Sequence, residues 1–369
     1  MRRWVAAVAA GVLLCGCGPE AGTAENPALA PDPRASAPAP PEPESLTILA
    51  TGDVLVHQGR ALTTGARQAD GSYDFGQVFA PVAGLVSGAD LAICHLETPV
   101  APEGGPYRGY PSFAVQPEIV GALAGAGYDL CSTASNHSLD AGFEGLTRTL
   151  DTLDEAGVAH TGTHRSEAES PTLVDVHGVA VGHVAATFGL NGVPLPAGRD
   201  WAVDVAAVPD VDGMLAQAAA ARAAGAEIVV ASLHCCREYD EDPTPAQVAA
   251  VRALLASPDV DLVLGHHAHV VQPFEQIGGK WVAYGLGNHL AEHETRGHPT
   301  EDSVAARFTF TRGDDGRFAV TRAEAVPLRI EIGTGSVRVV PADPASSARI
   351  AAVLDRRGAV AAGLGIVPG

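Results

Sequence analysis

VDLVLGHHAH, residues 260–269, is the stretch of sequence that decides the fold. Its first five residues are mostly apolar and predict a buried strand that ends just before Gly265. Because alternate residues of an extended segment point to one side, His267 and His269 can direct two imidazoles to one point beyond the strand. Imidazole is the commonest metal ligand among side chains, and α/β folds bind ligands at the carboxyl ends of their strands. The stretch therefore predicts an α/β fold with a metal site at this edge, against the alternative of a solvated histidine turn.

The first residues predict export rather than structure. Two arginines precede an apolar stretch, Trp4–Leu14, that is too short for a stable membrane span. A glycine then precedes Cys17, which resembles a bacterial lipoprotein signal over residues 1–17, with Cys17 as the lipidated N-terminus. Ordinary secretion with cleavage between residues 21 and 24 is the alternative. Residues 18–44 are rich in Pro, Ala, Glu and Ser and predict a disordered spacer. We therefore expect a lipid-anchored, extracytoplasmic protein at the cell membrane.

Composition and charge narrow the choice of partners. The chain has 369 residues, of which 46% are hydrophobic, enough for a large core. Its formal net charge of −20 argues against binding to nucleic acid or to anionic lipid surfaces.

Four of the six cysteines lie beyond the signal. Cys94 and Cys131 fall at similar heights on consecutive predicted strands, and an exported location permits a disulfide between them. The neighbouring Cys235 and Cys236 could be free thiols or lie close to a metal. None of the spacings matches a paired Cys-x-x-Cys zinc pattern, so no structural zinc site is predicted.

From Leu46 onward, short apolar runs alternate with longer stretches of helical period. This alternation indicates helices that cover sheets. The predicted strands span residues 46–50, 90–94, 129–133, 172–175, 179–186, 227–233, 260–264 and 281–285. The predicted helices span residues 79–86, 117–126, 142–156, 210–224 and 245–256. Beyond residue 302, strands over 304–311, 318–321 and 337–340 and a closing helix over 344–356 predict a β-rich appendage.

Polar residues follow five of these strands within a few positions. They combine carboxylate, amide oxygen and imidazole groups. This ligand set suits Mn, Fe, Zn or Mg better than it suits a metal that prefers thiolate ligands. Either one or two divalent ions would fit such a set. The residues concerned are Asp53, Glu97, Asn136, His137, His234, His267 and His269.

Ordered motifs between residues 46 and 291 carry a family resemblance. They are TGDV (51–54), HLETP (95–99), GYPSF (109–113), ASNHSLDAG (134–142), SLH (232–234) with Glu238-Tyr239, HAHVVQ (267–272) and YGLGN (284–288). By these motifs the chain resembles the CapA family of poly-γ-glutamate capsule synthesis proteins, whose domain is similar to calcineurin-like metallophosphoesterases.

The resemblance implies a metallophosphatase-like four-layer α/β/β/α sandwich. It would occupy residues 45–300, and residues 301–369 would form the C-terminal β-rich extension packed on it, with its closing helix. The resemblance further implies that Asp53 binds one metal together with His269, and that Glu97 bridges two. The second metal would be held by Asn136, His234 and His267.

The resemblance also implies a proton-transfer residue, and the residues around the expected site include candidates for substrate contact. His137 would be a general acid or a stabiliser of transition-state charge, positioned by Asp140. Arg108 and Tyr110 lie in a Gly/Pro loop that could reach an anionic ligand. The full set of proposed substrate contacts is His57, Arg108, Tyr110, Glu238, Tyr239 and Asn288; His293 and His298 could also touch substrate.

The chain departs from the family pattern at several positions. Leu55 stands where phosphoesterases have the histidine of Asp-x-His, so the first metal is short of a ligand. His57 could replace it only if the loop coils; otherwise it is a polar loop residue. Asp53 could instead cap a turn, and Asn136 could hold one. The remaining departures are His95 for Asn, Cys235-Cys236 for Trp-Gly, Ala268 for Pro and His289 for an aromatic residue.

Two functions are compatible with this sequence. The first is synthesis or export of a poly-γ-glutamate capsule, together with other membrane proteins of that process and with an anionic polymer as ligand. The second is a metal-dependent hydrolase of phosphoesters or γ-glutamyl amides that is unrelated to capsule.

Overall fold

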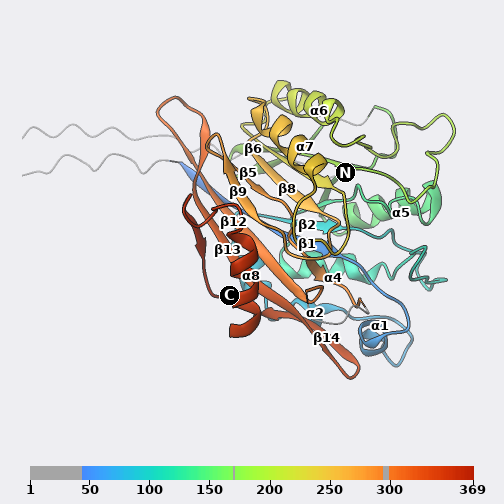
Figure 1. The fold of residues 1–369 in the computed structure, drawn as a ribbon. Coiled ribbons are helices and arrows are strands. Elements are labelled where there is room, and N and C mark those ends of the chain that lie inside the picture. The colour runs from blue at the N-terminus through green and yellow to red at the C-terminus, as the bar shows by residue number, and fades with distance from the viewer. Residues whose placement is uncertain (1–43, 169–170, 294–298) are drawn as a thin grey trace, which may run out of the picture. The chain divides into compact units, whose positions relative to one another are not determined.

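The structure is a computed structural model that describes residues 44–168, 171–293 and 299–369. Residues 43–369 form one compact unit. Within it, two β-sheets pack face to face and helices cover both outer faces (Figure 1). The predicted α/β/β/α sandwich is therefore confirmed.

The first sheet follows the order β14-β13-β12-β1-β2-β3-β4, with β11 paired to β1 and β15 to β13. Strands β1 to β4 are parallel to one another, so their carboxyl ends meet at one edge. The strands are β1 (Ser45–Val54), β2 (Leu91–Leu96), β3 (Leu130–Ser132), β4 (Ala159–Thr161), β11 (Asn288–Leu290), β12 (Asp302–Arg312), β13 (Phe318–Gly333), β14 (Ser336–Pro341) and β15 (Leu364–Ile366).

The second sheet follows the order β5-β6-β7-β8-β10-β9. Its central strands β6, β7 and β8 are also parallel. The strands are β5 (Thr172–Val176), β6 (Val179–Thr187), β7 (Ile228–His234), β8 (Leu262–His266), β9 (Phe274–Ile277) and β10 (Lys280–Ala283).

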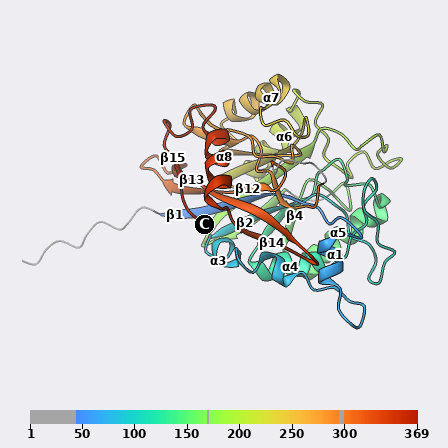
Figure 2. The same cartoon turned by 60° about the horizontal axis from the view of Figure 1, so that its bottom comes forward.

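Alternation along the strands divides the core into layers. In β1, Ile48 and Ala50 face the second sheet, whereas Leu49 faces the helices on the other side. Helices α1 to α5 cover the first sheet, and α6 and α7 cover the second (Figures 1 and 2). The helices are α1 (Ala61–Ala66), α2 (Gly76–Phe79), α3 (Ala83–Val86), α4 (Glu118–Ala126), α5 (Gly142–Glu155), α6 (Asp212–Ala223), α7 (Pro245–Ala256) and α8 (Pro344–Leu354).

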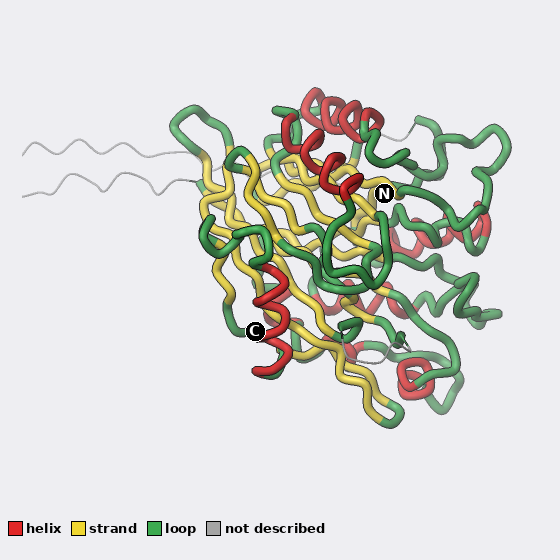
Figure 3. Tube along the Cα trace, in the orientation of Figure 1, coloured by secondary structure: helices red, strands yellow, loops and turns green. Residues whose placement is uncertain are grey.

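The C-terminal strands, expected as an extension packed on the main domain, pair directly into the first sheet. Strand β12 pairs antiparallel with β1 over residues 45–50, and β13 and β14 continue the sheet outward (Figure 3). Strand β13 is far longer than the segment predicted for it, 318–321. Helix α8 packs on the face of these strands that also meets the second sheet. The C-terminal segment therefore completes the core that supports β1.

The segment predicted as one helix over residues 79–86 contains only the last residue of α2 and the whole of α3. Pro81 lies between them and has no N–H to donate, so a continuous helix would lose a hydrogen bond there.

Both cysteine pairs beyond the signal are disulfides. Cys94 and Cys131 face each other in register on β2 and β3, with Cα atoms 4.4 Å apart. Cys235 and Cys236 are bonded to each other, so they are neither free thiols nor metal ligands here.

The predicted signal, the lipidation of Cys17, the spacer up to residue 43 and His298 lie outside the described residues. Among the helices that the structure describes, none combines the length and the apolar character needed to cross a bilayer.

Candidate metal centre

The candidate centre lies where the carboxyl ends of both sheets meet. Asp53 stands near the end of β1, directly across from His95 of β2, and Glu97 follows β2. In the second sheet, His234 ends β7 opposite His266 of β8. All these side chains are at most 2% exposed. Parallel pairing therefore brings together residues that lie far apart in the sequence.

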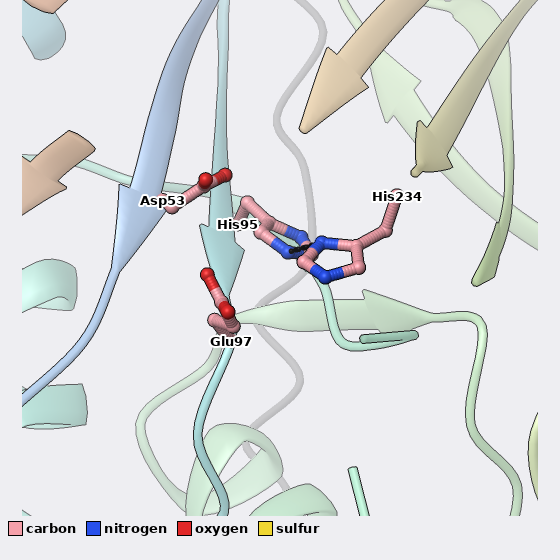
Figure 4. A group of neighbouring side chains, drawn as sticks. All are labelled: Asp53, His95, Glu97 and His234. Atoms are coloured by element: carbon pink, nitrogen blue, oxygen red, sulfur yellow. Dashed lines mark hydrogen bonds between the residues drawn. The ribbon is translucent and has the colours of Figure 1, made fainter. Parts of the chain in front are cut away.

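Two groups of potential ligand atoms share Glu97. In the first, atoms of Asp53, His95, Glu97 and His234 all lie within 4.8 Å of one another. Figure 4 shows these four side chains gathered at the strand ends. In the second, Glu97 joins His267 and His269 within the same limit. A carboxylate common to two groups matches the bridging role that the resemblance implied for Glu97. The other ligands divide differently from that expectation, because His234 groups with Asp53 and His269 groups with His267. The two groups therefore fit a centre for one or two divalent ions.

His267 and His269 reach the centre through their backbone conformation, not through the alternating side-chain directions of an extended segment. Their φ angles are 87° and 57°, so both residues adopt the left-handed conformation rather than an extended one. Non-glycine residues in this conformation cost about 1–3 kcal/mol each and cluster at functional sites. The backbone N–H of His267 donates to Asp53 Oδ2 at 3.1 Å, which holds the loop against β1.

Neighbouring amides orient two of the imidazoles. His269 Nδ1 donates to Asn288 Oδ1 at 2.9 Å, and the Asn288 amide donates to the backbone oxygens of His269 and Thr300. Asn136, expected as a ligand of the second metal, has its Oδ1 3.0 Å from His234 Nε2. Metal-binding histidines ordinarily bond an outer partner through the second ring nitrogen. Asn288, predicted to contact substrate, is fully buried and instead positions His269.

Burial and mutual contacts shift the pKa values of the centre. Burial raises the pKa of Glu97 well above its ordinary value. Burial would also raise the pKa of Asp53, but contacts with His266 and His269 hold it well below its usual range. Burial opposes protonation of His269, yet the Glu97 and Asp53 carboxylates raise its pKa to about 9. Burial lowers the pKa of His267 to about 3, which keeps that imidazole neutral. Neutral imidazole is the form that binds metals.

The unpartnered atoms of the centre fit a bound cation. Both carboxylate oxygens of Glu97, Nδ1 of His267 and Nε2 of His266 are buried and make no hydrogen bond. Burial of a carboxylate without a partner is strongly unfavourable, and a divalent ion would remove that cost. The oxygen and imidazole donors suit Mn, Fe, Zn or Mg.

The predicted His137–Asp140 pair forms beside the centre. His137 Nδ1 donates to Asp140 Oδ2 at 2.7 Å, and the Phe113 backbone N–H donates to the same oxygen at 2.7 Å. The Arg108 guanidinium donates to the Asp140 backbone oxygen at 3.0 Å. The contacts fix the ring of His137 and leave Nε2 as the nitrogen free for proton transfer.

The remaining predicted substrate contacts lie around the centre rather than in it. His57 belongs to neither ligand group; its Nδ1 accepts from the Glu292 backbone N–H, and its ring meets Phe113 and His293. Tyr110 is 79% exposed and Tyr239 is 46% exposed, with the Tyr239 ring 6.0 Å from that of His269. Glu238 is exposed beside it. These positions leave both tyrosines accessible to a ligand.

Sequence reasoning missed His95 and His266. His95 lies two residues before Glu97 on β2, so the period of two that places Glu97 at the centre also places His95 there. His266 Nδ1 lies 3.2 Å from Asp53 Oδ1, and its ring stacks on that of His95 with centroids 4.2 Å apart. The signal for His95 was present in the strand pattern.

The buried ring of His289 should make the stability of the folded protein depend on pH. Burial lowers its pKa from 6.5 to about 3 in the folded protein. Between these values the unfolded chain holds a proton that the folded chain does not, so the metal-free protein loses stability as the pH falls. The free energy of unfolding therefore changes with pH. We expect His289→Phe to reduce this change by about 1.4 kcal/mol per pH unit, as measured by urea unfolding between pH 4 and 6.

The matched control for His289 is Tyr128→Phe. It removes the hydrogen bond between Tyr128 Oη and His289 Nε2 but keeps the titrating ring. The control should retain the wild-type slope; equal slopes in wild type and His289→Phe would contradict the assignment.

Comparison with known proteins places this geometry in a family context. The family model described as bacterial capsule synthesis protein PGA_cap matches residues 47–293. Capsule biosynthesis protein CapA of Bacillus anthracis is 27% identical over 305 residues, which cover 79% of this chain and 69% of that protein. A probable polyglutamine synthesis accessory protein of Mycobacterium tuberculosis is 31% identical over 255 residues, 65% of this chain and 66% of that protein. The chain thus spans about two thirds of the length of each.

Among solved structures, the calcineurin-like phosphoesterase YfkN from Bacillus subtilis is similar with a TM-score of 0.44 and 14% identity. The match covers 77% of this chain and 90% of that one.

Proposed function

The chain belongs to the PGA_cap family of bacterial capsule synthesis proteins, and from that premise we propose that it serves the synthesis or export of a poly-γ-glutamate capsule through a divalent-metal centre. The observation that carries the proposal is the buried Glu97 carboxylate, which accepts no hydrogen bond at either oxygen and is shared by two groups of ligands. The chain is itself strongly acidic, so a polyanionic polymer would be repelled unless cations intervene. A metal centre supplies such cations.

The ligands fall into the two groups already described. Asp53 and His234 would bind on one side of Glu97, and His267 and His269 on the other. Bound divalent ions would stabilise negative charge that develops on a substrate oxygen. Because Asn288 and Asn136 fix two of the imidazoles, the site is organised before a ligand arrives.

His137 would move a proton at this centre. Asp140 holds its Nδ1–H, so Nε2 is the atom that gives or takes a proton at the reacting bond. The same pair favours the second candidate function, a metal-dependent hydrolase of phosphoesters or γ-glutamyl amides unrelated to capsule. The substrate separates the two, since only the first requires the polymer.

We further propose that the protein is anchored through Cys17 and works outside the cytoplasm, beside other membrane proteins of capsule synthesis. The lipoprotein-like signal supports this location. The Cys94–Cys131 and Cys235–Cys236 disulfides support it as well, because disulfides persist mainly in oxidising compartments.

Polymer production in cells tests the proposal. A bacterium that makes poly-γ-glutamate, and lacks its own member of the family, would be complemented with wild-type protein or with His234→Ala/His267→Ala. We expect the double variant to yield polymer only at the level of the empty vector, at equal protein abundance. His177→Ala is the control, because that side chain is 75% exposed and lies outside both ligand groups. Wild-type polymer output from the double variant would exclude a role for the centre in this process.

A further inference from the structure

His95 belongs to the first of the two ligand groups, although the family pattern has asparagine at this position. On β2 it pairs with Asp53 of β1 on one side and with Ser132 of β3 on the other. Its side chain is fully buried. Its potential ligand atom lies within 4.8 Å of those of Asp53, Glu97 and His234 (Figure 4).

We propose that His95 is a direct ligand of the metal centre and replaces the donor that is missing at Leu55. The proposal rests on the metal centre of the proposed function and names a ligand of that centre specific to this chain.

Leu55 leaves a gap in the ligand set. It occupies the second position after Asp53, is 2% exposed and packs in the core between the first sheet and its helices. Because its side chain is a hydrocarbon, it offers no nitrogen or oxygen to a metal. His57, the next histidine along the chain, lies in neither ligand group. His95 lies directly across from Asp53 on the neighbouring strand, and its ligand atom is within 4.8 Å of the Asp53 carboxylate.

The contacts of His95 match those of a metal-binding histidine. Its Nδ1 lies 2.8 Å from Ser132 Oγ, an outer partner that fixes the ring. Its Nε2 lies 2.9 Å from His234 Nδ1. Two nitrogens bound to one ion at about 2.1 Å lie about 3 Å apart when they occupy adjacent positions. The two imidazoles therefore already have the separation of neighbouring ligands on one ion.

The alternative is that His95 only orients His234 through their contact. Cobalt binding distinguishes the two roles, because each histidine bound to Co²⁺ gives one strongly shifted, solvent-exchangeable ring N–H signal in proton NMR. Metal-free protein would be saturated with Co²⁺ alone, as wild type and as His95→Asn. Asparagine keeps a group that can hydrogen-bond to His234 but removes the imidazole. Circular dichroism would verify the fold, and His95→Gln would replace the variant if it does not fold.

We expect His95→Asn to lose one shifted signal and to bind Co²⁺ more weakly by over ~100-fold, beyond the 10–100-fold typical of losing a residue that only orients a ligand. Loss of all binding by a folded variant would support the ligand role as well. An unchanged number of signals at saturation would overturn it.

His183→Gln is the matched control. His183 is equally buried and bonds Ser232 Oγ at 2.8 Å, but it lies outside both ligand groups, so its loss should leave every signal in place. If the wild type itself binds no Co²⁺, the metal centre of the proposed function fails. If the wild type binds and His95→Asn keeps all signals, only the role of His95 fails.

Discussion

Glu97→Gln is expected to abolish tight metal binding while making the metal-free protein more stable. Glutamine keeps the shape of the side chain but removes the charge that two ligand groups share. We expect the affinity for Mn²⁺, measured by calorimetry, to fall by more than ~100-fold, because loss of an outer partner alone costs 10–100-fold.

Although the substitution should weaken metal binding, it should raise the stability of the metal-free protein. Burial raises the pKa of Glu97 well above its ordinary value, so ionisation of this group opposes folding at neutral pH. In EDTA the variant should therefore unfold at a higher temperature than the wild type. Added Mn²⁺ should raise the midpoint of the wild type only, since a ligand stabilises the state that binds it.

Glu118→Gln is the control for both measurements. Glu118 also has a buried, unpartnered carboxylate oxygen, but it begins α4 and lies outside both ligand groups. It should retain wild-type Mn²⁺ affinity. Wild-type affinity in Glu97→Gln would instead show that the shared carboxylate is not a ligand.

His137→Ala is expected to lower turnover by about 10²–10⁴-fold without removing metal. The Asp140 carboxylate holds the ring of His137, and neither residue belongs to a ligand group. The measurement is kcat of metal-loaded protein on a generic phosphodiester and on poly-γ-glutamate, with metal content determined in parallel. Asp140→Asn should lose less activity, because the imidazole remains but is held less firmly.

Unchanged kcat in His137→Ala, at equal metal content, would remove His137 from the chemistry. His177→Ala serves as the control for a histidine substitution on the surface. Turnover of the phosphodiester without turnover of poly-γ-glutamate would favour the second candidate function over the first.

The strand ends of the centre could be predicted because parallel pairing needs only the positions of apolar runs. Asp53, Glu97 and His234 each follow such a run, and the structure brings them together. The loop after β8 could not be predicted in the same way. There His267 and His269 converge through left-handed backbone conformations, which the pattern of alternate residues does not encode.

The surroundings of the centre depend on contacts between distant segments. Strand β11 is three residues long, yet it pairs with β1 at Asp53 and carries Asn288, which positions His269. So short a strand has no sequence signal of its own. The place of β12 beside β1 likewise follows from tertiary pairing, so the C-terminal strands were predicted as strands but not as members of this sheet.

Anomalous X-ray scattering at the manganese edge, from crystals of the full protein soaked in Mn²⁺, tests the central claim most directly. The account predicts a strong peak within bonding distance, about 2.2 Å, of a Glu97 carboxylate oxygen and of at least one imidazole nitrogen among His95, His234, His267 and His269. Saturating Mn²⁺ with no peak beside Glu97, or with peaks only at surface carboxylates, would contradict it.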